Sequence, residues 1–324
     1  MSYMYIGLPI PHKEHENRRA LLPVDVASLA KPEQLVFEAG YGQVLGQDDD
    51  AYRTAGASVK PRCDVCECPI ICNPKPMASD EYFGSGKTLF GWIHAVQGRE
   101  ITELLVKHKM TAIAWEEMHQ DGRHSFWRNN ELSGEAAVMH ALLHWGRIAF
   151  GSQVAVIGRG NVARGAVRML ERLGCCLTVY DRRTSHLLRQ EIQRYDIIVN
   201  AVLWDVFRED HLVYEADLGN MKPGGLIIDI SCDEGMGIQS SRPTTIASPV
   251  FRHDGILHYV VDHTPALFYQ TVTESISKVV AAFAGDLERP ESNPVLDKAT
   301  IVRGGRILDD RIIRFQGLSL QGCS

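Results

Sequence analysis

The sequence predicts an α/β protein built of two Rossmann-like, doubly wound parallel-sheet domains with a cleft between them. Short apolar segments typical of buried strands alternate with amphipathic helical segments along the chain. This alternation starts again near residue 152, after a long helical segment. A chain of 324 residues is also too long for one small core and about right for two domains.

Composition narrows the class of function. The hydrophobic content of 45% and charged content of 23% are typical of a globular protein, and the net charge is −6. An acidic chain without a basic stripe argues against nucleic-acid binding, and no segment approaches the ~20 apolar residues of a membrane span. The N-terminus lacks the pattern of a signal peptide, so we expect a cytoplasmic protein.

The first predicted domain comprises residues 1–130 together with 265–324, and we expect it to bind substrate. Its strands are predicted at residues 3–8, 34–40, 69–72, 87–93 and 110–116. Its helices are predicted at residues 23–30, 48–59 and 99–109, with a long helix at 265–287 and a terminal β-hairpin within 299–315.

The second predicted domain, residues 131–264, begins with a long helix at 131–149 that we expect to link the two domains. Its strands are predicted in the segments SQVAVIG, CLTVYD, DIIVNAV, GGLIIDIS and HYVVDH. Strands that alternate with helices in this way indicate a parallel sheet.

Four cysteines within ten positions, Cys63, Cys66, Cys68 and Cys72, raise the alternative of a metal site. A structural zinc site usually needs two CxxC-like pairs, and only Cys63 and Cys66 have that spacing. We therefore favour a helical turn followed by a short strand, with the cysteines packed as small hydrophobic residues and no metal bound.

The segment VAVIGRGNVARGA carries the strongest local signal. A buried strand runs into Gly158, Gly160 and Ala163, with Asn161 and Val162 between them, and a helix follows. This strand–turn–helix fits the G-x-G-x-x-A dinucleotide-binding pattern, in which Gly160 lets the pyrophosphate approach the helix N-terminus.

The next predicted strand ends at Asp181, at about the ~20-residue distance expected for a ribose-binding carboxylate. Asp181 favours NAD(H), whereas Arg182 and Arg183 could pair with the 2′-phosphate of NADP(H). The sequence leaves both cofactors open, with NADP(H) slightly favoured.

With these residues in place, the chain resembles the alanine dehydrogenase and transhydrogenase superfamily from about residue 3 to 287. The segments that carry the resemblance are NRRALLP, FGWIHA, NNELSGEAAVMHAL, VIGRGNVARGA and SPVFRHDGILHYVVDHTPALFYQ. The branch most similar to it is that of N5-(carboxyethyl)ornithine synthase. The segments IVNAVLW and LIIDISCDEG also resemble the saccharopine-forming lysine–ketoglutarate reductase branch.

The resemblance implies substrate-side roles for particular residues. Arg18 matches a carboxylate-binding arginine, and His94 matches an active-site histidine that donates a proton or polarises a carbonyl. The family lysine falls on Asn73 when counted back from His94, whereas Lys75 lies two positions later. We narrowly favour Lys75 as the acid–base residue, with Asn73 as a substrate-binding alternative.

Further residues follow from the same resemblance. Asp233 matches an aspartate near the nicotinamide, and Val202 and Leu203 are placed beside the cofactor. Glu116 is expected to bind the ammonium of the amino acid or to orient Lys75. Together with Glu117 and Glu131, Glu116 is also expected to form an acidic rim.

The function that the resemblance implies is NAD(P)H-dependent, opine-type reductive condensation of a 2-oxo acid such as pyruvate with ornithine or lysine. Alanine dehydrogenase and saccharopine-type activities are alternatives, and a transhydrogenase-like nucleotide-binding subunit is the non-enzymatic one. The expected partners are therefore small molecules, and we also expect a homo-oligomer.

Overall fold

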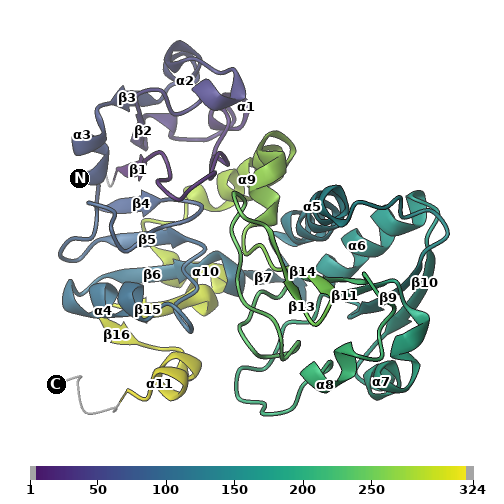
Figure 1. Cartoon of the computed structure of the whole chain (residues 1–324). Helices are drawn as coiled ribbons and strands as arrows, with labels where there is room; N and C mark the ends of the chain where they lie inside the picture. Colours follow the sequence, from purple (N-terminus) through teal and green to yellow (C-terminus); the bar gives the residue numbers. More distant parts are fainter. Residues whose placement is uncertain (1–4, 319–324) are drawn as a thin grey trace. The chain divides into compact units, whose positions relative to one another are not determined.

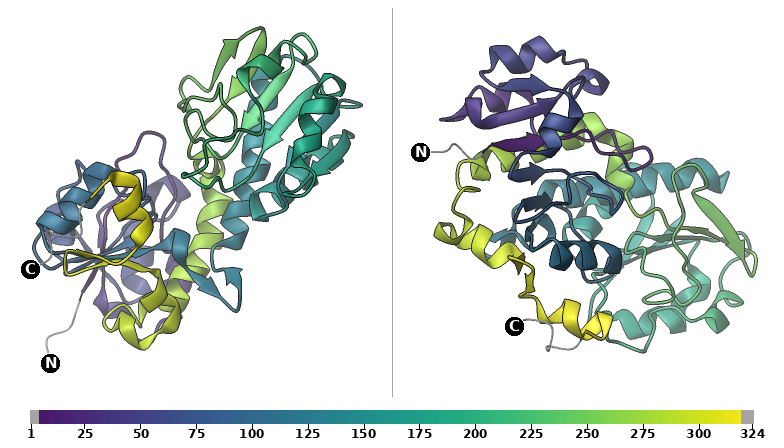
Figure 2. Two further views of the ribbon diagram at one scale, coloured as in Figure 1. Left: turned by 90° about the horizontal axis from the view of Figure 1, so that it is seen from below. Right: turned by 90° about the vertical axis from the view of Figure 1, so that its left-hand side faces the viewer.

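The computed structural model describes residues 5–318, and its chain divides into two units (Figure 1). Unit 1 comprises Met1–Phe126 and Tyr269–Ser324, and unit 2 comprises Trp127–Phe268. Each unit contains one large sheet dominated by parallel pairing and covered by helices, which confirms the predicted α/β class (Figure 2).

Unit 1 contains an eight-stranded sheet in the order β16-β15-β6-β5-β4-β1-β2-β3. The strands are β1 (Ile6–Leu8), β2 (Leu35–Glu38), β3 (Ser58–Lys60), β4 (Ile70–Cys72), β5 (Thr88–Gly91), β6 (Thr111–Ala114), β15 (Thr300–Arg303) and β16 (Arg306–Ile307). β1 to β6 pair in parallel, and β15 and β16 extend the sheet in antiparallel pairing. Because β1 pairs with both β2 and β4, strand order reverses beside β1, where open α/β sheets bind ligands.

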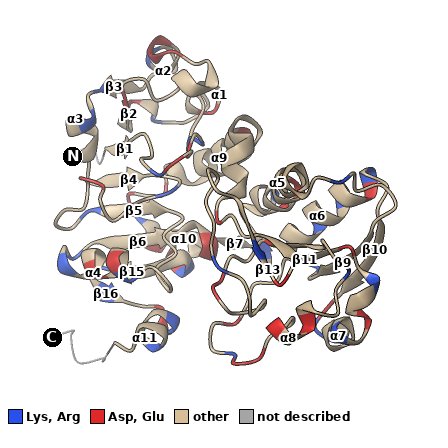
Figure 3. Cartoon of the chain, in the orientation of Figure 1, with Lys and Arg blue, Asp and Glu red and all other residues tan. Residues whose placement is uncertain are grey.

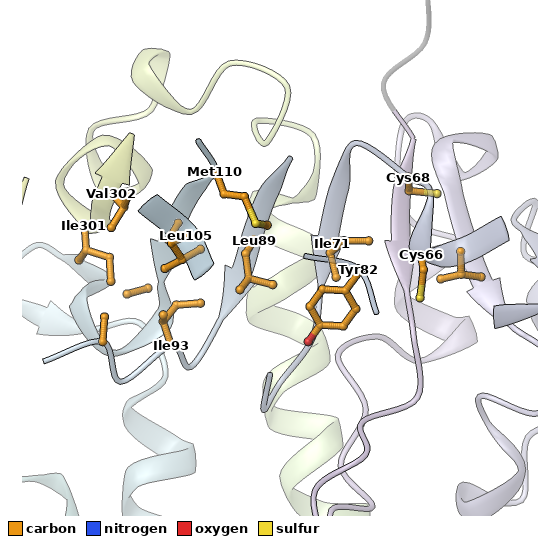
Figure 4. Packing of buried hydrophobic residues seen from close by; sticks show 14 of the residues in the cluster. Cys66, Cys68, Ile71, Tyr82, Leu89, Ile93, Leu105, Met110, Ile301 and Val302 are labelled. Atoms are coloured by element: carbon orange, nitrogen blue, oxygen red, sulfur yellow. The ribbon is translucent and has the colours of Figure 1, made fainter. Parts of the chain in front are cut away.

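Helices and a small hairpin complete unit 1. They are α1 (Pro23–Val26), α2 (Asp49–Thr54), α3 (Arg62–Cys66), α4 (Arg99–Lys107), α9 (Tyr269–Ala284), α10 (Pro294–Ala299), α11 (Asp310–Gln316), β7 (His119–Gln120) and β8 (Arg123–His124). Ile301 and Val302 pack in one buried cluster with Ile71, Leu89 and Met110 (Figure 4). The C-terminal segment therefore belongs to the core that the N-terminal strands begin.

Unit 2 contains a six-stranded sheet in the order β10-β9-β11-β12-β14-β13. Its elements are α5 (Trp127–Trp145), β9 (Gln153–Ile157), α6 (Asn161–Arg172), β10 (Cys176–Tyr180), α7 (Leu188–Glu191), β11 (Ile197–Asn200), α8 (Glu215–Leu218), β12 (Leu226–Asp229), β13 (Val250–His253) and β14 (Ile256–Tyr259). All pairs except β13–β14 are parallel, and strand order reverses beside β9. The glycine-rich turn that follows β9 thus lies at a switch point of the sheet.

Two glycines let α5 and α6 pack closely. A Cβ on Gly134 would lie 2.0 Å from the carbonyl oxygen of Val162, and one on Gly165 would lie 1.9 Å from that of Glu131. The Glu131 carboxylate also binds Arg168 on α6, at 3.2 Å from Nη1. This packing fixes α6, and with it the turn that precedes its first residue.

Several predicted boundaries differ from those observed. The predicted helix 48–59 ends at Thr54, because Gly56 has a φ of +97° and the chain continues into β3. The predicted helix 265–287 begins at Tyr269, after a 3₁₀ turn over Thr264–Phe268. The predicted hairpin in the tail is present as β15 and β16, but its last residues form α11. Residues 3 and 4 of the first predicted strand lie outside the described residues.

Acidic and basic residues are interspersed along both units (Figure 3). Within residues 5–318, no helix is both long and apolar enough to cross a bilayer.

Candidate active site

The predicted substrate residues of unit 1 follow neighbouring parallel strands. Arg18 lies in the loop after β1, Asn73 follows β4, His94 follows β5 and Glu116 follows β6. The carboxyl ends of parallel strands meet at one edge of a sheet, so the structure brings these four residues to the same edge.

Arg18 is buried and held in one orientation. Its Nε donates to Glu16 Oε1 at 2.7 Å and its Nη2 to Glu16 Oε2 at 2.5 Å. The guanidinium also lies over the Trp92 ring, 5.0 Å from its centroid. Within the described chain, Nη1 donates to no protein acceptor. A guanidinium fixed along one edge in this way can present its other edge to a ligand.

The neighbouring Arg19 has a different environment. Its Nε donates to the carbonyl oxygen of Tyr41 at 2.6 Å, and its backbone N–H donates to Thr273 Oγ1 at 3.0 Å. Burial lowers the pKa of Arg19. Arg19 therefore ties the loop to the core of unit 1, while Arg18 takes the orientation that a ligand would need.

His94 is exposed and has a φ of +50°, which is unusual for a residue other than glycine. The Glu116 carboxylate holds this backbone, because Oε1 accepts the N–H of His94 at 2.6 Å and Oε2 accepts that of Ile93 at 3.2 Å. Burial raises the pKa of Glu116 to about 7, against the lowering effect of these N–H donors. Glu116 thus orients the backbone of His94. The sequence had instead suggested that Glu116 binds the ammonium of the amino acid or orients Lys75.

The three carboxylates expected to form an acidic rim are all engaged. Glu116 accepts backbone N–H groups, Glu117 binds Arg311 Nη2 at 2.6 Å, and Glu131 binds Arg168. The structure therefore does not support an acidic rim built from these residues.

Asn73 is fully buried and supports the turn that carries Lys75. Its Nδ2 donates to Tyr82 Oη at 3.0 Å, and its Oδ1 accepts the backbone N–H of Lys75 at 3.0 Å. Tyr82 in turn donates to Asp80 Oδ2 at 2.5 Å. β4 ends at Cys72, so Lys75 lies in a turn and not on the strand, and it is half-buried there.

The cysteine-rich segment forms the predicted helical turn and strand, α3 and β4. Burial raises the pKa of Cys66, that of Cys68 to about 11, and that of Cys72 further still. Cys66 and Cys68 belong to the buried hydrophobic cluster of unit 1, and Cys72 is buried as well.

His12, Asp80 and Glu81 also cluster, in the geometry of possible metal ligands. The Arg62 guanidinium lies among them, with Nη2 2.9 Å from Glu81 Oε2 and 3.5 Å from Asp80 Oδ1. Arg62 supplies the positive charge that these carboxylates require.

In unit 2, the two glycines of the turn after β9, Gly158 and Gly160, have different surroundings. Gly158 has a φ of +119°, and a Cβ there would lie 2.8 Å from the carbonyl oxygen of Ala201. A Cβ on Gly160 would meet no described atom within 4 Å. The fold therefore requires Gly158, whereas the space at Gly160 fits a pyrophosphate that approaches the backbone.

The start of α6 can supply the donors for such an anion. Gly160 is its N-cap and has no side chain to satisfy the first N–H groups, which begin at Asn161 and Val162. Ala163 is buried and lets α6 pack near the turn, with its Cβ 3.6 Å from the position of a Cβ on Gly158. The structure thus contains the strand–turn–helix that the sequence pattern predicts, with an open helix N-terminus.

Asp181, at the end of β10, is fixed by its own turn. Oδ1 accepts the Arg183 N–H at 2.9 Å and the Thr184 hydroxyl at 3.1 Å, and Oδ2 lies 3.2 Å from Arg159 Nε. These donors, the Arg183 N–H foremost, lower the pKa of Asp181. Arg182 and Arg183 are exposed beside it. Arg159, which the sequence analysis missed, offsets the negative charge of Asp181.

A second feature that the sequence analysis missed is a buried polar cluster at the ends of β11 and β12. Asp229 Oδ1 accepts from Asn200 Nδ2 at 2.9 Å, and Oδ2 accepts from Ser241 Oγ at 2.5 Å. Burial raises the pKa of Asp229 to about 6. The polar last residues of two otherwise apolar strands were a signal that could have identified it.

This cluster supports the loops that carry the remaining predicted residues. Asn200 Oδ1 accepts the Val202 N–H at 3.4 Å, and Leu203 beside it is almost fully exposed. Asp233 follows Cys232, which has a φ of +58°. Asp233 is half-buried in the loop between β12 and β13, which also contains Ser241.

The fold and these residues define a two-unit α/β protein with a Rossmann-type, glycine-rich strand–turn–helix in unit 2. Residues 7–127 match the family model "Alanine dehydrogenase/PNT, N-terminal domain", and residues 182–314 match "Alanine dehydrogenase/PNT, C-terminal domain". The chain belongs to the alanine dehydrogenase/PNT family.

Individual relatives show the same likeness over most of their length. The N(5)-(carboxyethyl)ornithine synthase of Clostridium botulinum is 27% identical, over 85% of this chain and 92% of its own. The alanine dehydrogenase of Mycobacterium tuberculosis is 26% identical, over 95% of this chain and 96% of its own. A solved L-alanine dehydrogenase structure superimposes with a TM-score of 0.83, at 23% identity over 98% of this chain and 100% of its own.

The open space at Gly160 leads to the first prediction. Gly160→Ala should leave the free energy of unfolding within about 0.5 kcal/mol of wild type and weaken dinucleotide binding at least about tenfold, since only the ligand meets the new methyl group. Urea denaturation and calorimetric titration with the dinucleotide measure the two effects.

Gly165→Ala is the matched control on the same helix. Its methyl group would collide with backbone of α5, so we expect a loss of about 2 kcal/mol or more of stability. Equal losses of stability in the two variants would contradict the assignment of Gly160 to the ligand.

The burial of Glu116 predicts a pH dependence of stability. Because its pKa rises from 4.5 to about 7 on folding, the folded state binds this proton more tightly. The resulting stabilisation is complete below about pH 4.5 and is lost as pH rises through about 7. Over this range the wild type should lose about 1–3 kcal/mol more stability than Glu116→Gln. Urea denaturation at several pH values tests this, and parallel pH profiles would contradict it.

Proposed function

We propose that the chain is an NAD(P)H-dependent oxidoreductase acting on CH–NH bonds. It reductively condenses a 2-oxo acid, pyruvate, with the side-chain amine of ornithine or lysine to give an N-(carboxyalkyl) amino acid. The likeness to N(5)-(carboxyethyl)ornithine synthase supports this choice within the family. The observation that carries it is the arrangement at one sheet edge of a fixed, buried Arg18 and an exposed His94 that Glu116 orients.

The chemistry requires an amine, a 2-oxo acid and a hydride. The amine adds to the keto carbon, and loss of water gives an imine. The nicotinamide, when bound, supplies the hydride that reduces the imine carbon, and a proton completes the secondary amine. The protein must bind the carboxylate, deliver and remove protons, and exclude bulk water.

In unit 1, the free edge of the Arg18 guanidinium binds the carboxylate of the 2-oxo acid. His94 donates the proton that leaves with the carbonyl oxygen as water. Lys75 serves as the second acid–base group, and Asn73 orients it through the bond to its backbone N–H. The role of positioning the incoming amine is assigned to Asp233 from the family resemblance alone.

In unit 2, the turn from Gly158 to Ala163 holds the pyrophosphate, and Val202 and Leu203 border the nicotinamide half of the cofactor. NADP(H) is slightly favoured over NAD(H). Arg159 pairs with Asp181 and offsets the charge that would repel a 2′-phosphate, and Arg182 and Arg183 are exposed to bind that phosphate.

Ammonia is the second candidate for the amine, supported by the likeness to an alanine dehydrogenase over nearly the whole chain. With ammonia the same steps yield alanine, and the amine site would need no room for a diamino acid.

A matrix of amines against 2-oxo acids tests the proposal, with loss of NADH or NADPH as the readout. We expect turnover with pyruvate and a diamino acid, and faster turnover with NADPH. Turnover with ammonia alone would favour the second candidate. Turnover with 2-oxoglutarate and lysine would indicate a saccharopine-type activity. Tight cofactor binding without turnover in any combination would indicate a non-catalytic, nucleotide-binding protein.

His94→Asn should lower kcat by about 10²–10⁴-fold, since the amide cannot transfer the proton. Asparagine tolerates the left-handed backbone that His94 adopts, so the loop should keep its conformation. Steady-state kinetics measure the loss of kcat, and cofactor titration measures whether cofactor affinity is kept. A comparable loss of cofactor affinity would assign His94 a structural role.

A further inference from the structure

Two histidines in the last two turns of α5 face each other. His140 is half-buried, His144 is exposed, and the two lie one turn apart on the helix, at i and i+4. Their rings meet edge to face with centroids 4.9 Å apart, and their Nε2 atoms are 3.4 Å apart. Neither histidine belongs to the proposed catalytic or cofactor-binding residues, so the proposed function gives this pair no role.

The separation of the two ring nitrogens matches the requirement of a metal ion. Zn²⁺ binds imidazole nitrogens at about 2.0–2.1 Å in tetrahedral geometry, which places two such nitrogens about 3.4 Å apart. The observed 3.4 Å is long for a hydrogen bond, whose usual range ends near ~3.2 Å. Two histidines at i and i+4 on one helix face are also a known ligand pair for Zn²⁺. The two Nε2 atoms therefore have the spacing of two ligands on one ion.

A buried tyrosine orients the first of the two ligands. His140 Nδ1 lies 2.9 Å from the hydroxyl oxygen of Tyr259 on β14, and Tyr259 is fully buried. When a metal takes the lone pair of Nε2, the ring proton lies on Nδ1, where Tyr259 Oη can accept it. Metal-bound histidines usually donate their other ring N–H to an oxygen acceptor, which fixes the orientation of the ring. The core of unit 2 thus supports His140 as a ligand.

A second histidine pair has a similar ring spacing and a different environment. The rings of His119 on β7 and His124 on β8 have centroids 5.0 Å apart. His124 Nδ1 accepts the backbone N–H of Phe126 at 3.0 Å, and His124 Nε2 lies 3.2 Å from the carbonyl oxygen of Glu116. Backbone groups therefore occupy both ring nitrogens of His124. Ring spacing alone does not make a metal site, and the α5 pair differs because its two Nε2 atoms face each other.

We propose that His140 and His144 bind a divalent transition-metal ion through their two Nε2 atoms. Imidazole suits Zn²⁺, Ni²⁺ and Cu²⁺, whereas Mg²⁺ and Ca²⁺ prefer oxygen ligands. Because His144 is exposed, water can complete the coordination of the ion. The bound ion joins the last two turns of α5, and His140 connects it to β14 through Tyr259. Its role is therefore to fix the end of α5.

The experiment titrates the full-length, tag-free chain with ZnCl₂ by calorimetry, after a chelator has removed bound metals. The wild type should bind Zn²⁺, and His144→Ala should weaken this binding at least about tenfold, since even the partners of metal ligands contribute about tenfold or more. Cu²⁺ should bind more tightly than Zn²⁺, and its electron paramagnetic resonance spectrum should show two coordinated nitrogens in the wild type and one in the variant. Because His144 is exposed, the variant should fold, and circular dichroism checks this.

His119→Ala is the matched control and should leave the affinity for Zn²⁺ unchanged. A wild type that does not bind Zn²⁺, or equal affinities in the wild type and His144→Ala, would overturn the proposal. Binding that survives His144→Ala and is lost in His12→Ala would place the ion at the cluster of His12, Asp80 and Glu81 instead. These measurements involve no turnover, so their outcome does not depend on the proposed function.

Discussion

Parallel pairing on both sides of the strand that comes first in sequence in each sheet is the constraint on which both units depend. β1 pairs with β2 and β4, and β9 pairs with β10 and β11, so each sheet has a switch point beside its first strand. Parallel strands all end at the same edge. Residues as distant in sequence as Arg18 and Glu116 therefore share one edge of unit 1, and Gly158 and Asp229 share one edge of unit 2.

The loops at these edges depend on buried polar groups for their conformation. Glu116 holds the backbone at His94, and Asp229 binds the side chain of Ser241 in the loop that also carries Asp233. Left-handed backbone conformations at His94 and Cys232 each cost of order 1–3 kcal/mol and persist only where the surroundings determine them. The carboxyl groups of Glu116 and Asp229 therefore hold loop conformations. Burial raises the pKa of both groups.

The glycines of unit 2 show how fold and ligand requirements divide within one motif. Gly134 and Gly165 are needed for the approach of α5 to α6, and Gly158 for the turn after β9. At Gly160, a Cβ would contact no neighbouring atom of the described chain, so the packing of residues 5–318 does not require a glycine there. The sequence pattern treats Gly158 and Gly160 alike, and only the positions of neighbouring atoms distinguish a glycine that the fold requires from one that it does not.

The sequence by itself determined the α/β class, the order of most strands and helices, and the dinucleotide turn, because these depend on local periodicity and on a strand–turn–helix of contiguous residues. A family resemblance also proposed Arg18 and His94 as site residues, and the structure places both at one sheet edge. The tertiary structure decided the partners: Glu16 for Arg18, Glu116 for the backbone of His94, Arg159 for Asp181, and Arg311 for Glu117. Such pairings join side chains from separate loops, and no pattern within one segment specifies which acceptor a donor will meet when the strands align.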